Sequence, residues 1–108
     1  DHQMERLGRV DMLLELLEND PQDLFLNYAL GLEYAGVLKF HEAQQQFKVV
    51  LDLDVNYIPC YYQLGKLCEA QSQINEALSY YKQGLVKARQ KKDKSVHEFE
   101  EAIFLLED

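Results

Sequence analysis

Histidine side chains could carry chemistry in this chain, because paired histidines bind metals and single ones transfer protons. The sequence has three, His2, His41 and His97, and none has a partner at the spacing of a metal site. Glu42 follows His41, but the second histidine that a zinc-protease helix needs four residues on is missing. We therefore expect surface histidines and no bound metal.

The two cysteines, Cys60 and Cys68, are a second candidate for chemistry. On one helix they would lie about 12 Å apart along the axis, which is too far for a disulfide. Two unpaired thiols fit a reducing compartment, so we expect a cytoplasmic protein. We interpret both as small core residues rather than as nucleophiles or metal ligands.

Other catalytic patterns are missing from the sequence. It contains no glycine-rich phosphate loop and no nucleophile elbow, and its many carboxylates fall on the expected outer faces of helices. Two repeat units of this size would form no deep pocket with a coupled acid, base or nucleophile. We therefore predict that the protein is not an enzyme, has no catalytic residues and needs no cofactor.

The net charge of the chain disfavours some classes of binding partner. Its 108 residues carry a formal net charge of −8, which argues against nucleic-acid binding. No apolar run reaches the roughly 18 residues of a membrane span. Five of the eleven basic residues nevertheless cluster near the end of the chain. We interpret this cluster as the C-terminus of a helix followed by a solvated loop, with a site for an anionic partner as the alternative. The cluster comprises Lys87, Arg89, Lys91, Lys92 and Lys94.

An internal repeat of 34 residues is the main structural signal. When the sequence is shifted by 34, identical residues coincide mostly at apolar and small positions with helical spacing, as a repeat built on packing requires. The coinciding pairs are Tyr28 and Tyr62, Leu30 and Leu64, Gly31 and Gly65, Glu42 and Glu76, Ala43 and Ala77, Lys48 and Lys82, and Leu51 and Leu85.

The apolar spacing within each repeat predicts two helices, and the richness in helix-forming residues makes the fold all-α. We expect about six helices in one domain: an N-terminal helix over 3–20, repeat 1 over 24–57, repeat 2 over 58–91 and a capping helix over 95–107. The first helix has its apolar face at Met4, Leu7, Val10, Leu13, Leu14 and Leu17.

Helix starts are predicted from capping residues. Asp20 is the expected N-cap before Pro21, and Asp23 would favour the positive end of the helix dipole. Ser95 and Glu98 have the spacing of a capping box that opens the last helix. Gly36 is expected to loosen the chain near a turn.

Two mid-helix glycines, Gly31 and Gly65, need a physical reason, because each costs about 1 kcal/mol relative to alanine. We expect them to admit a bulky residue from a neighbouring helix, with Ala43 and Ala77 playing the same part on the partner helices. The residues expected to fill these notches are Tyr34, Phe47 and Tyr81.

These residues resemble the tetratricopeptide-repeat (TPR) pattern of a large residue, Leu-Gly, an aromatic, and later alanine and a second aromatic. The first unit matches at Leu30-Gly31, Tyr34, Ala43 and Phe47. The second unit matches at Tyr61, Leu64-Gly65, Ala77 and Tyr81. Pro21 falls at the family's proline position, so the opening helix resembles the second half of an earlier repeat.

The resemblance covers essentially the whole chain and implies a right-handed α-solenoid with end-capping helices. The chain also resembles small bacterial proteins built only of such repeats, which would make it a complete protein. It departs from the pattern in ways that soften the repeat boundaries and suggest that the first helix is an end cap. The departures are Val55 and Arg89 at proline positions, Val50, Gly84 and Arg9 at alanine positions, and Cys68 at an aromatic position.

The resemblance implies a concave groove, lined by the first helix of each repeat, that binds a protein or peptide. By position, the groove residues are Phe25, Tyr28, Leu32 and Ala35 in repeat 1, and Pro59, Tyr62, Lys66 and Glu69 in repeat 2. The alternative for the aromatic residues among them is packing against the end helices.

The lysine and asparagine clamp that some TPR domains use for terminal carboxylates is not matched, since Tyr28, Leu32 and Gln63 occupy its positions. The predicted function is therefore a non-catalytic adaptor or scaffold whose ligand has apolar side chains. Self-association into a homodimer through the groove or an end helix is the alternative, because Leu14 or Leu105 could be left exposed.

Overall fold

The computed structural model describes residues 2–107 and contains six helices and no strand within that range. The all-α class and the number of helices expected from the sequence are thereby confirmed. The helices are α1 (His2–Asn19), α2 (Leu24–Gly36), α3 (Phe40–Leu53), α4 (Ile58–Ala70), α5 (Ile74–Lys91) and α6 (Val96–Leu106). None of the described helices is long and apolar enough to cross a membrane.

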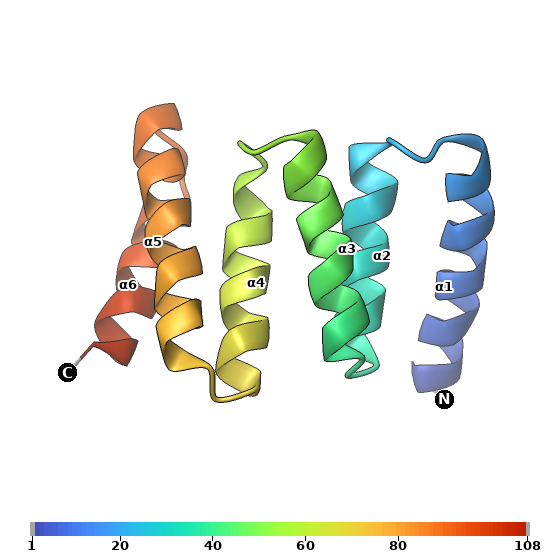
Figure 1. Ribbon diagram of the computed structural model, residues 1–108, viewed down its shortest axis with the longest axis horizontal. Coiled ribbons are helices and arrows are strands. Elements are labelled where there is room, and N and C mark those ends of the chain that lie inside the picture. The colour runs from blue at the N-terminus through green and yellow to red at the C-terminus, as the bar shows by residue number, and fades with distance from the viewer. Residues whose placement is uncertain (1, 108) are drawn as a thin grey trace. The chain divides into compact units, whose positions relative to one another are not determined.

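The helices form two compact units, an N-terminal unit up to Val55 and a C-terminal unit from Asn56. In the N-terminal unit α2 packs against both α1 and α3, and in the C-terminal unit α5 packs against both α4 and α6 (Figure 1). Each unit therefore contains a tightly packed helix pair and one additional helix.

Aromatic rings fill the glycine notches that join each helix pair. A methyl group on Gly31 would lie less than 3.0 Å from the ring atoms of Phe47, and one on Gly65 would collide with the ring of Tyr81. Both rings are completely buried, as are Ala43 and Ala77. The expected close approach is thus confirmed for Phe47 and Tyr81. Tyr34 fills no notch.

One cluster of the core of the N-terminal unit lies between α1 and α2. Val10 and Leu13 are buried against Leu30, and Tyr34 packs against this cluster. The predicted apolar face of the first helix is only partly correct, because Leu17 also packs against this cluster but three of its apolar residues are substantially exposed. The exposed fractions are 70% for Met4, 39% for Leu7 and 43% for Leu14.

An acidic residue on α2 connects the first two helices. Glu33 accepts hydrogen bonds from Arg9 at 2.8 Å and Arg6 at 3.3 Å. The guanidinium of Arg6 lies against Gly36, where a methyl group would collide with it. Gly36 therefore lies against the flexible end of an arginine side chain, and its expected role in the turn stays a prediction.

The N-cap prediction for the second helix was wrong by three residues. Asp23, not Asp20, is the N-cap of α2 and accepts a hydrogen bond from the backbone N–H of Leu26 at 2.8 Å. The buried Asn27 amide donates to the carbonyl oxygens of Pro21 and Asp23 and holds the connection against the helix. Because these bonds keep Pro21 outside the helix, the first turn begins later than expected.

The capping box predicted for the last helix is also wrong. Ser95 makes no side-chain cap bond to α6. Its hydroxyl donates to Asp93 Oδ2 at 2.5 Å, and its backbone N–H donates to the same oxygen at 2.9 Å. Asp93 therefore organises the α5–α6 turn and takes the hydroxyl that a capping box would use.

Non-glycine residues adopt left-handed conformations at three helix ends, with φ of 62° at Leu38, 60° at Ser72 and 53° at Lys92. Leu38 and Ser72 are 34 residues apart, so the turn repeats with the sequence. The bond from Gln73 N–H to the Cys68 carbonyl at 2.8 Å closes α4 in a Schellman motif, where glycine is the usual residue.

We predict that Gly31→Ala and Gly65→Ala each lower the free energy of unfolding by about 1–3 kcal/mol, because the added methyl overpacks the ring contact. Gly8→Ala is the matched control, since nothing lies within 4 Å of its added methyl, and should raise stability by about 1 kcal/mol. Urea denaturation followed by circular dichroism measures all three. A gain in all three variants would contradict the packing argument.

We also predict that Ser72→Gly raises the free energy of unfolding by about 1 kcal/mol, because the left-handed conformation strains any residue with a Cβ. Ser72→Ala retains the Cβ and serves as the control, with no such gain. An equal response of the two variants to urea would show that the backbone strain contributes nothing measurable.

Candidate functional site

The predicted groove residues of repeat 1 occupy one face of α2, because they are spaced three or four residues apart. Phe25 is 70% exposed, whereas Tyr28, Leu32 and Ala35 are half-buried. The ring of Tyr28 packs against Phe47 with centroids 5.7 Å apart. The N-terminal unit therefore presents one largely free aromatic ring beside one that the core supports.

The equivalent tyrosine of repeat 2 is held more firmly. The ring of Tyr62 contacts Tyr81 at 5.7 Å between centroids and Phe99 of α6 at 5.9 Å. The Tyr28–Phe47 and Tyr62–Tyr81 pairs have interplanar angles of 47° and 46°. The two repeats therefore hold their aromatic pairs in nearly the same geometry. Through Phe99 the last helix partly covers Tyr62.

Lys66 and Glu69, the charged residues predicted for the groove, are already engaged within the C-terminal unit. Lys66 Nζ lies 5.3 Å from the centre of the Tyr62 ring and 3.7 Å from Glu69 Oε2. Glu69 also accepts a short hydrogen bond from the hydroxyl of Tyr81. Burial and this carboxylate both raise the pKa of Tyr81, so its hydroxyl stays protonated and donates.

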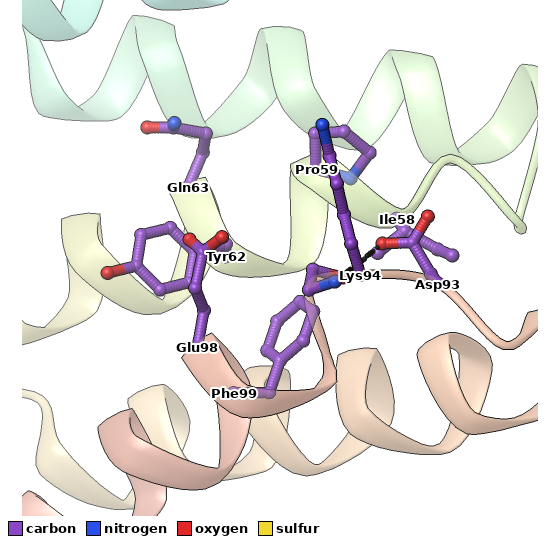
Figure 2. Close-up of a pocket in the computed structure, with 9 residues that line it drawn as sticks. Ile58, Pro59, Tyr62, Gln63, Asp93, Lys94, Glu98 and Phe99 are labelled. Atoms are coloured by element: carbon purple, nitrogen blue, oxygen red, sulfur yellow. Dashed lines mark hydrogen bonds between the residues drawn. The ribbon is translucent and has the colours of Figure 1, made fainter.

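A cavity of about 290 Å³ opens beside Tyr62, between the start of α4 and the turn that leads into α6. Figure 2 shows Glu98 and Phe99 extending from α6 toward α4, where Tyr62 lies. Lys94 reaches toward Pro59 at the other end of the cavity. The complete lining is Ile58, Pro59, Tyr62, Gln63, Asp93, Lys94, Ser95, Glu98 and Phe99.

The turn between α5 and α6, which contains Asp93 and Ser95, forms one edge of this cavity. The hydrogen bonds from the side chain and backbone of Ser95 lower the pKa of Asp93, so its carboxylate remains ionised and keeps both bonds at neutral pH. A smaller hollow of about 100 Å³ adjoins the cavity, because Tyr62 and Glu98 line both. Its other lining residues are Lys66, Glu101, Ala102 and Leu105.

Sequence reasoning did not predict that α6 helps to line a cavity. It assigned Glu98 only to a capping box. The available signal was Gly84, because a methyl group there would collide with the ring of Phe99. Gly84 is thus a third glycine notch, after Gly31 and Gly65, and it lies on α5. A glycine at this place indicates that a large residue from a later helix packs against α5.

Among residues 2–107 no group of three or more histidine, cysteine or acidic side chains is placed to hold a metal ion. Both cysteines are free and buried, as expected for core residues. Burial raises the pKa of Cys60 from 9.0 to about 12, so its thiol stays protonated at neutral pH.

We predict that neither native thiol reacts rapidly with a disulfide reagent at pH 8 and that both react once the protein is unfolded in urea. The shift of Cys60 stabilises the folded state fully below about pH 9. This contribution is lost as the pH rises from 9 toward 12, because only the unfolded thiol releases its proton there. Rapid labelling of the native protein would contradict the buried positions.

Comparison with known proteins gives no matching family model but many similar structures. A tetratricopeptide repeat domain protein from Salinibacter ruber is 32% identical over 82% of this chain and 90% of its own, with a TM-score of 0.76. A protein from Bordetella parapertussis is 26% identical over 90% of this chain and 85% of its own, with a TM-score of 0.80.

The TPR2B domain of yeast Sti1, whose structure is that of a complex with pHsp70, has a TM-score of 0.86 at 17% identity. The match covers 97% of this chain and 85% of the other chain. This likeness shows a shared fold, while the identity to the Salinibacter protein is high enough to show a shared family.

Proposed function

Because this chain belongs to the tetratricopeptide-repeat family, we propose that it is a non-catalytic module that binds a protein or peptide partner. The proposal is supported by the TPR2B domain of Sti1, which has the same fold and whose structure is of a complex with pHsp70.

The binding surface we propose is the predicted concave face of the first helices of repeats 24–57 and 58–91. In repeat 1 it comprises Phe25, Tyr28, Leu32 and Ala35, and in repeat 2 it comprises Tyr62, Lys66 and Glu69. The observation that carries this proposal is Phe25, a phenylalanine 70% exposed on the same helix face as Tyr28. Exposed aromatic residues are frequent anchors of protein interfaces.

We extend the proposal to an adaptor or scaffold in the bacterial cytoplasm. Two bacterial proteins are among the similar structures, and the two unpaired, buried thiols suit a reducing compartment. Neither observation identifies a partner, so the test must select ligands without assuming one.

We predict that selection from a random peptide library on the immobilised protein enriches peptides with apolar anchors. Nuclear magnetic resonance shifts should map these peptides to the proposed face. Phe25→Ala should weaken their binding about tenfold or more, because it removes an aromatic anchor. Phe104→Ala is the control, since Phe104 is 77% exposed but lies on α6, outside the proposed face. Failure to select any peptide would overturn the proposed function.

Self-association is a second candidate, favoured by apolar residues exposed on the end helices. Leu105 is 70% exposed and Leu14 is 43% exposed. Light scattering distinguishes the two candidates, because a homodimer gives twice the monomer mass. A monomer mass at every concentration would remove self-association and leave peptide binding in place.

A further inference from the structure

The cavity and the adjoining hollow form one furrow along the C-terminal unit, which we call the α4–α6 furrow. Its α4 side carries Pro59, Tyr62, Gln63 and Lys66, and its α6 side carries Glu98, Glu101, Ala102 and Leu105. On both helices these residues follow the spacing of a single face. Two facing helix surfaces therefore line the furrow.

One end of the furrow is suited to a single apolar side chain. Ile58, Pro59 and the rings of Tyr62 and Phe99 supply its apolar walls, and the two rings contact each other with centroids 5.9 Å apart. Its volume of about 290 Å³ lies at the lower limit for small-molecule sites. The shape and lining thus fit an aliphatic side chain of a peptide better than a cofactor.

The charges along the furrow favour a cationic neighbour for that side chain. The side-chain carboxylates of Glu98 and Glu101 make no hydrogen bond or salt bridge to any residue in the described range 2–107. In contrast, Lys66 is paired with Glu69, and Lys94 lies beside the ionised Asp93. The free charges facing a ligand are therefore mainly negative, in a chain whose net charge is −8.

We propose that the α4–α6 furrow binds an extended peptide segment in which one aliphatic side chain is flanked by lysine or arginine. The aliphatic side chain occupies the cavity, and the flanking cations meet Glu98 and Glu101. Glu98 and Glu101 are about 4.5 Å apart along the axis of α6. Side chains two positions from the aliphatic one project to the same side of an extended peptide, about 6.8 Å along it, so long lysine or arginine side chains there reach the carboxylates. This inference rests on the proposed function and specifies the partner's chemistry.

The test uses a labelled, capped peptide whose only apolar residue is a leucine with two lysines on each side. We expect saturable binding by fluorescence anisotropy and resonance shifts confined to residues 58–66 and 93–105. Replacing the four lysines with glutamates, or the leucine with serine, should weaken binding about tenfold or more. A glutamate peptide that binds equally well, or shifts that map elsewhere, would overturn the proposal.

Protein variants separate local recognition from general charge attraction. Glu98→Gln combined with Glu101→Gln should weaken binding of the lysine peptide about fivefold, the effect of two exposed ion pairs. Glu15→Gln combined with Glu18→Gln makes the same change in net charge on α1 and should alter binding less than about twofold. Equal losses in the two double variants would reject the furrow as the site.

The outcome of the library selection distinguishes failure of this inference from failure of the proposed function. If the selected peptides carry acidic residues around their apolar anchor, the cationic preference is wrong while peptide binding stands. If the library yields no peptide at all and the lysine peptide does not bind, both proposals fail. Enrichment of lysine or arginine beside an aliphatic residue supports both.

Discussion

Contact between an aromatic ring and a helix backbone is the constraint on which the rest of this structure depends. Phe47 and Tyr81 occupy space that a side chain on Gly31 or Gly65 would fill, and Phe99 does the same at Gly84. A glycine within a helix weakens that helix locally, so the ring contact must return more than this loss. The three contacts explain why the two helix pairs and the last helix pack as they do.

The same rings also position the candidate binding residues. Phe47 supports Tyr28, and Tyr81 supports Tyr62 while its hydroxyl holds Glu69. A side chain on the proposed binding face is therefore oriented by a residue whose main role is in the core. This coupling implies that changes to Tyr28 or Tyr62 affect packing as well as binding, whereas Phe25, which is largely exposed, reports on binding more cleanly.

The helices and two of the three notches could be predicted from the sequence because they depend on local spacing that occurs twice. Details that depend on competition between hydrogen-bond partners could not be predicted. Asp20 and Asp23 are both good cap residues, and the bonds from Asn27 to the backbone decide between them. The Ser95 hydroxyl had two possible partners, the backbone N–H of Glu98 as a donor and the Asp93 carboxylate as an acceptor, and it bonds to Asp93. The cavity could not be predicted from helical spacing or from capping residues, because it forms only where α6 packs against Tyr62.

Pairing within the C-terminal unit changes which charges a ligand meets. Lys66, judged by position alone, is a cation in the proposed groove and would favour an acidic partner. In the structure Lys66 forms a salt bridge with Glu69, and its ammonium group lies over the ring of Tyr62. A carboxylate ligand would have to displace Glu69, which Tyr81 also holds. Because Glu98 and Glu101 have no such internal partners, a cationic ligand gains interactions there without breaking any, and this asymmetry gives the furrow its preference.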